Sequence, residues 1–154
     1  MQTRTLLNTI LLTILACGFG VARGGEVRYV DSSATGTNNG TNWTDAFVHL
    51  QDALYASSSG DEIWVAEGIY RPDRGGGQTL GDRNASFHLI NGVAIYGGFP
   101  AGGGTWDDRS AEYETVLSGD LNSDDAESYA TVRDAWNSGK RRDNSYHVVT
   151  AELC

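Results

Sequence analysis

An acidic run from Asp120 to Asp125 is the part of the sequence whose residue types and spacing best fit a chemical task. The oxygen-bearing side chains of Asp120, Asn122 and Asp124 alternate along the chain, and Asp125 follows directly. Ca²⁺ takes roughly six to eight oxygen ligands, and this spacing lets a tight loop wrap several of them around one ion. A bound cation would also relieve the repulsion between the carboxylates. We therefore predict a Ca²⁺ site formed by these four residues.

The alternative for this run is a solvated acidic loop, and the sequence leaves both interpretations open. The complete EF-hand pattern is absent, because Asp125 stands in the place of the turn glycine and Thr131 in the place of the bidentate glutamate. Glu127 adds a further carboxylate nearby. A strand expected at residues 115–117 directly precedes the run and would hold one end of the loop in place.

The other reactive side chains show no catalytic pattern, and we predict no catalytic residue and no active site within this chain. Three histidines lie on an expected helix and two expected strands, without the spacing of metal ligands: His49, His88 and His147. Trp106 and Trp136 lie in polar loops, so we expect their rings to be exposed and available for stacking on sugars.

The charge of the chain excludes some classes of partner. Twenty acidic side chains stand against 11 basic ones in 154 residues, which gives a net charge of −9. Phosphate backbones and anionic membrane surfaces would repel such a chain, so nucleic-acid binding is not expected. The hydrophobic content of 40% is enough for a globular core.

The N-terminus has the pattern of a secretory signal peptide over residues 1–24. Arg4 precedes an apolar stretch from Leu6 to Ala22, and small residues follow. A buried helix or a membrane span is the alternative, but the uninterrupted apolar run is shorter than the roughly 20 residues that a bilayer requires. We predict a secreted or cell-surface protein without a transmembrane span. Cleavage would remove Cys17 and leave only Cys154, so no internal disulfide is expected.

The mature chain begins with a strand and a helix and continues as short strands. Residues 26–31 alternate apolar and polar side chains, and Thr44 is placed to cap a helix with an apolar stripe that includes Leu50 and Leu54. The later strands are expected at residues 62–66, 86–90, 93–96, 115–117 and 146–150. Their spacing falls within the repeat range of solenoids. An ordinary β-sandwich is the alternative.

Several sequence blocks together resemble the opening segment of extracellular right-handed parallel β-helix proteins of the pectin-lyase-like group. The blocks are residues 29–31, 40–43, 50–54, 60–70, 95–99, 115–120 and 143–149. The resemblance implies a mainly β fold, a right-handed parallel β-helix solenoid with an N-terminal amphipathic capping helix. We therefore expect a strand and capping helix over residues 25–60. The first coils follow over residues 61–154, in a fragment that is incomplete at the C-terminus because its last strand lacks a covering neighbour.

The resemblance also frames the expected function. The group includes polysaccharide lyases and hydrolases, and also surface proteins without known activity. We expect an exported cell-surface or secreted protein of the binding or structural class that contacts glycans or other cell-surface partners. The alternatives are a secreted polysaccharide lyase or hydrolase whose catalytic residues lie beyond residue 154, and a purely structural passenger domain. Fold alone does not decide between them.

Overall fold

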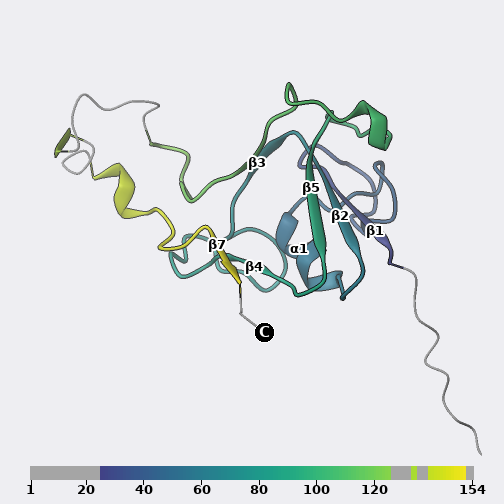
Figure 1. The fold of residues 1–154 in the computed structure, drawn as a ribbon. Coiled ribbons are helices and arrows are strands. Elements are labelled where there is room, and N and C mark those ends of the chain that lie inside the picture. The colour runs from purple at the N-terminus through teal and green to yellow at the C-terminus, as the bar shows by residue number, and fades with distance from the viewer. Residues whose placement is uncertain (1–24, 126–132, 135–138, 152–154) are drawn as a thin grey trace, which may run out of the picture.

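The computed structural model describes residues 25–125, 133–134 and 139–151. The signal-peptide pattern, both cysteines, Glu127, Thr131 and Trp136 lie outside these residues. The elements with described bounds follow in chain order (Figure 1): β1 (Val27–Val30), α1 (Leu50–Ala56), β2 (Glu62–Ala66), β3 (Gly68–Tyr70), β4 (Phe87–Leu89), β5 (Ala94–Phe99), the 3₁₀ turn η1 (Trp106–Asp108), β6 (Thr115–Leu117), the 3₁₀ turn η2 (Lys140–Arg142) and β7 (Val149–Ala151).

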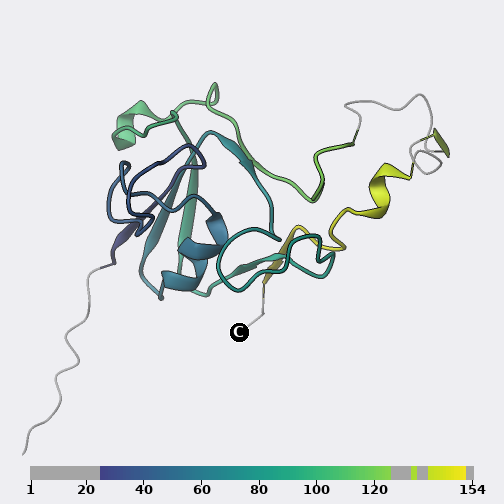
Figure 2. The same ribbon diagram turned by 180° about the vertical axis from the view of Figure 1, so that it is seen from behind.

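All of these strands pair in parallel. β1, β2 and β5 form a three-stranded sheet with β2 in the centre, and α1 lies against one face of it (Figures 1 and 2). β3 pairs with β6, and β4 pairs with β7. Apart from β1 and β2, the paired strands are not consecutive along the chain, so these pairs join segments that are far apart in the sequence.

The expectation of a right-handed parallel β-helix is wrong. Strands of only three to six residues form three small sheets with two or three strands each, and no solenoid of stacked coils is seen in the described residues. The connections explain the difference, since residues 71–86 separate β3 from β4 whereas residues 118–148 separate β6 from β7. The spacing of the strands falls within the repeat range of solenoids, but it arises from loops of unequal length and does not reflect a repeated coil.

The start of the helix also differs from the expectation. Residues 44–49 are not helical, and α1 begins at Leu50 after His49. Phe47 instead lies beside β1, where its N–H donates to the Tyr29 carbonyl and its carbonyl accepts from the Asp31 N–H. These two hydrogen bonds hold Phe47 in an extended conformation beside β1, so the helix does not begin at Thr44 as expected. The Asp45 carboxylate accepts a hydrogen bond from the Thr37 N–H, which lowers the pKa of Asp45.

The core lies between α1 and the strands. Leu50 and Leu54 of α1 are buried together with Ile63 and Val65 of β2 and with Phe87 of β4. These apolar side chains are the ones that the helical stripe and the strand alternation direct inward. Burial of this kind stabilises the fold by about 1.5–3 kcal/mol for each large side chain.

Tyr70, the last residue of β3, is part of the core. Its hydroxyl donates to the Ala66 carbonyl (3.1 Å) and accepts from the Ser32 N–H (3.4 Å), while its ring is buried. Burial disfavours the charged phenolate and raises the pKa of Tyr70 to about 12. The hydroxyl is therefore neutral over the physiological range and serves as a structural hydrogen-bonding group.

Candidate metal centre

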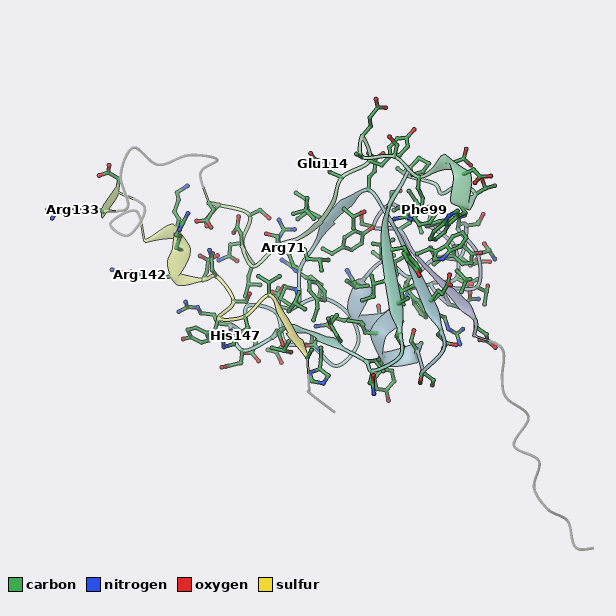
Figure 3. All side chains as sticks on the ribbon, viewed as in Figure 1. Arg71, Phe99, Glu114, Arg133, Arg142 and His147 are labelled. Carbon is green, nitrogen blue, oxygen red and sulfur yellow. The ribbon has the colours of Figure 1, made fainter. Side chains whose placement is uncertain are left out.

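The acidic loop, residues 120–125, follows β6 and is anchored at its base by buried and hydrogen-bonded groups. Leu121 is fully buried, so the loop is pinned to the core one residue after Asp120. Arg71 Nε donates to the Asp120 carbonyl (2.6 Å), and Arg74 Nη2 donates to the Leu121 carbonyl (3.1 Å). Arg71 lies on the side of the core that faces this segment (Figure 3). These contacts fix the backbone at the start of the acidic loop.

Three carboxylates converge at this loop. Oxygens of Asp120, Asp124 and Asp143 all lie within 4.8 Å of one another. Asp143 comes from the segment that follows η2, and it meets the loop because the Asn122 N–H donates to its Oδ2 (3.2 Å) and the Ser145 N–H donates to the Gly119 carbonyl (2.8 Å). A cluster of this composition can hold a metal ion, since hard cations prefer carboxylate oxygens.

The loop folds around the Asp120 carboxylate. The Asp124 N–H donates to Asp120 Oδ1 (3.1 Å), and the Asp125 N–H donates to its Oδ2 (3.2 Å). Ser123, which directly precedes Asp124, adopts a left-handed conformation with φ of 60°, and this turns the chain sharply. Each Asp120 oxygen keeps a lone pair available, because a carboxylate oxygen accepts more than one bond.

Two buried carboxylate or amide oxygens, one in the cluster and one in the residue after Asp143, have no hydrogen-bond partner among the described residues. They are Asp124 Oδ1 and Asn144 Oδ1. A buried oxygen without a donor costs roughly 1–3 kcal/mol, and a coordinated cation would remove that cost. Asp124 Oδ1 belongs to one of the three clustered carboxylates, and Asn144, the residue after Asp143, has an amide oxygen.

Two of the four residues predicted from the sequence lie in the carboxylate cluster. Asp120 and Asp124 meet in the cluster, whereas Asn122 contributes its backbone N–H to Asp143. The Asp125 carboxylate turns away, because its Oδ2 accepts from Asn144 Nδ2 (2.7 Å) and its Oδ1 lies 4.0 Å from Arg141 Nε. The sequence reasoning missed Asp143. The available signal was its position just before an expected strand, which mirrors the position of Asp120 just after one.

The histidines do not join a metal centre in the described part of the chain. His49 precedes α1, and His88 on β4 lies with its Nδ1 3.3 Å from Thr150 Oγ1 of β7. His147 is exposed just before β7 (Figure 3). The clusters of possible metal ligands among the described residues include no histidine.

Trp106 is 44% exposed but is already engaged by other groups. Its ring centroid lies 4.9 Å from that of Tyr96 and 5.4 Å from that of Trp64, and the Arg109 guanidinium carbon lies 4.5 Å from it. These rings pack around the buried Phe99, on the opposite side of the molecule from the acidic loop (Figure 3). A sugar would have to displace Arg109 to stack on this face, so Trp106 is better explained as packing for the η1 loop.

Within the described residues, no helix is long and apolar enough to cross a membrane. Comparison of the chain with protein-family models, with curated proteins and with solved structures finds no match.

Proposed function

We propose that the protein is exported and that it works at the cell surface or outside the cell as a binding or structural protein, with a Ca²⁺-binding acidic loop and with glycans as its partners. The observation that carries the proposal is the convergence of Asp120, Asp124 and Asp143 within 4.8 Å. The signal-peptide pattern of residues 1–24 supports export.

Ca²⁺ suits this cluster better than Mg²⁺ does. Mg²⁺ demands a nearly ideal octahedron of ligands at about 2.0–2.1 Å, whereas Ca²⁺ accepts irregular geometry with longer bonds. The carboxylates come from two loop segments, with Asp124 and Asp143 separated by 19 positions in the sequence, and such segments do not impose a regular octahedron. Asp120, Asp124 and Asp143 would each supply an oxygen ligand, and water or loop carbonyls would complete the shell. The affinity of extracellular Ca²⁺ modules, about 10⁻⁴ to 10⁻³ M, sets the range we expect.

The bound ion would act by joining two segments. The acidic loop follows β6, and Asp143 lies a few residues before β7, so an ion between them fixes the path of the chain into the β4–β7 pair. The proposed role of Ca²⁺ is therefore structural, since it would hold the loops of a binding protein in one arrangement.

Isothermal titration calorimetry of Ca²⁺ into the whole chain tests the site. We expect saturable binding with a dissociation constant of about 10⁻⁴ to 10⁻³ M. We also expect a higher melting temperature with Ca²⁺, because a ligand that binds only the native state stabilises it. Replacing Asp120 and Asp124 together with Ala should abolish both effects. A melting temperature that stays unchanged in millimolar Ca²⁺ would contradict the site.

Export is tested separately by N-terminal sequencing of the protein recovered from its source cells. We expect the mature chain to begin between Arg23 and Glu26, where the small residues follow the apolar stretch. A cytosolic protein that retains Met1 would contradict export without affecting the metal site.

A further inference from the structure

An exposed tyrosine stands between two hollows on the surface of α1. Tyr55 is 92% exposed, the highest value among the large hydrophobic side chains of the described residues. On one side lies a hollow of about 540 Å³, whose lining includes Asn38, Asp52 and Gly76. On the other side lies a hollow of about 240 Å³, whose lining includes Gln78 and His88. Tyr55 and Gly76 line both, so the two hollows lie next to each other.

Packing does not account for Tyr55. The helix buries Leu50, Ala53 and Leu54, and Tyr55 lies off that stripe. Among the described residues, no ring stacks on Tyr55 and its hydroxyl has no hydrogen-bond partner. This separates it from Trp106, whose surface is shared with Tyr96 and Arg109. An aromatic ring that contributes nothing to the core and is flanked by hollows is a candidate for ligand contact.

The glycine-rich segment that lines both hollows is held in place without a ligand. The Gly76 N–H donates to Asp52 Oδ1 (2.6 Å), which ties the glycine-rich segment to α1. Gly75 has φ of 107°, a backbone conformation that favours glycine, and a Cβ on it would make a tight contact of 3.1 Å with the His49 Cβ. A segment fixed in this way lowers the entropy cost of binding.

The groups around Tyr55 select the chemistry of the ligand. The larger hollow offers the Asn38 amide and the Asp52 carboxylate, and the smaller one offers the Gln78 amide and the His88 imidazole. Sugars match this set, because their C–H faces stack on an aromatic ring and their hydroxyls bond to amides and carboxylates. The volume of the larger hollow lies within the usual range of about 300–1,000 Å³ for ligand sites.

The charge of the residues around the two hollows narrows the class of ligand further. No described residue that lines either hollow is a lysine or an arginine, and Asp52 is acidic. The whole chain carries a net charge of −9. An anionic ligand would gain no cation here and would be repelled by the field of the protein.

We infer that Tyr55 and its two hollows bind a neutral oligosaccharide, with one sugar ring stacked on Tyr55 and its neighbours along the chain in the two hollows. This inference rests on the proposed function, because it names the site and the sugar class for the proposed glycan binding. It does not depend on the acidic loop.

The test is calorimetric titration of the whole chain with two sets of hexasaccharides. The neutral set contains β-1,4-glucan, β-1,4-mannan and α-1,4-glucan hexamers, and the acidic set contains oligogalacturonate. We expect binding of a neutral hexamer, with about tenfold weaker affinity for Tyr55→Ala, because loss of a stacking ring removes about 1.4 kcal/mol. Tyr55→Phe keeps the ring and should bind within about threefold of the wild type. Tyr146→Ala is the matched control, since Tyr146 is 60% exposed and lines neither hollow.

The outcomes separate this inference from the proposed function. If a neutral hexamer binds equally well to the wild type and to Tyr55→Ala, the inference is overturned and glycan binding stands. If only oligogalacturonate binds, the charge argument fails and the inference fails with it, while glycan binding again stands. If no hexasaccharide of either set binds, the inference fails together with the glycan part of the proposed function.

Discussion

Replacing Asp143 with Asn tests the metal centre sharply, because the expected change in stability reverses sign when Ca²⁺ is added. Without metal, the Asp143 oxygen lies within 4.8 Å of oxygens of both Asp120 and Asp124. Two unit charges at this distance repel by about 0.9 kcal/mol in water and by about 3.5 kcal/mol at an effective dielectric constant of about 20. The substitution removes two such repulsions, and the new amide oxygen can still accept the Asn122 N–H.

Salt screening and partial exposure reduce this gain. Asp143 is half-buried, so the value in water is the better starting point, and two pairs then give about 2 kcal/mol before screening. We expect the metal-free variant to be about 1 kcal/mol more stable than the wild type. For a chain of this length that corresponds to a melting temperature higher by about 2–4 °C.

Ca²⁺ should reverse the order of the two proteins. At about 100 times its dissociation constant, the ion stabilises the wild type by about 2.7 kcal/mol. The variant lacks one of three charged ligands, and each tenfold loss of affinity lowers the stabilisation at a given Ca²⁺ concentration by up to about 1.4 kcal/mol. A hundredfold loss would leave the variant about 1 kcal/mol less stable than the wild type in Ca²⁺, despite its advantage without metal.

Thermal unfolding followed by tryptophan fluorescence measures this reversal of the stability order. The melts are recorded in EDTA and at Ca²⁺ concentrations raised in 10-fold steps. Asp125→Asn is the matched control, because Asp125 lies in the same loop but directs its carboxylate to Asn144 and Arg141. Its Ca²⁺ dependence should parallel that of the wild type. If Asp143→Asn keeps one order relative to the wild type in both buffers, the three carboxylates do not share an ion.

Two other predictions concern the groups that support the loop and the core. Leu121→Ala should lower the free energy of unfolding by about 2–5 kcal/mol, as measured by urea denaturation, because Leu121 is fully buried; a loss below about 1 kcal/mol would show that Leu121 does not anchor the acidic loop. Tyr70 has its pKa raised by burial to about 12, so its contribution to stability is complete below pH 10 and is lost as the pH rises from about 10 to 12. Tyr70→Phe should therefore be less stable than the wild type at pH 8 and should close that gap by pH 12 in urea melts; a constant gap would contradict a neutral buried hydroxyl.

The sequence predicted the strands better than it predicted their assembly. The strand expected at residues 115–117 has the observed bounds of β6, and the one expected at residues 62–66 has those of β2. Both follow from local alternation of apolar side chains, which the chain carries without reference to its partners. The prediction of a solenoid was wrong, because the lengths and paths of the loops decide how the strand pairs are arranged. The helix start failed for a similar reason, since the bonds between Phe47 and β1 are tertiary.

The residues of the metal centre also differ in whether local sequence or tertiary structure brings them together. Asp120 and Asp124 could be predicted because their contact depends on a turn within one short loop, through the Asp124 N–H to Asp120 Oδ1. Asp143 could not, because it reaches the cluster only through the return of the chain toward β7, where the Ser145 N–H bonds to the Gly119 carbonyl.

This dependence also indicates where an ion would have its effect. Neither the acidic loop nor the Asp143 segment belongs to a sheet, so separate hydrogen bonds, and not a strand ladder, fix one against the other. An ion held by both would add several ligand bonds at this point, whereas β4 and β7 are joined over only three residue pairs. Ca²⁺ should therefore stabilise the β4–β7 pair more than the β1–β2–β5 sheet. Slower amide hydrogen exchange in Ca²⁺ at residues 87–89 and 149–151, with little change at residues 62–66, is the pattern that this coupling requires.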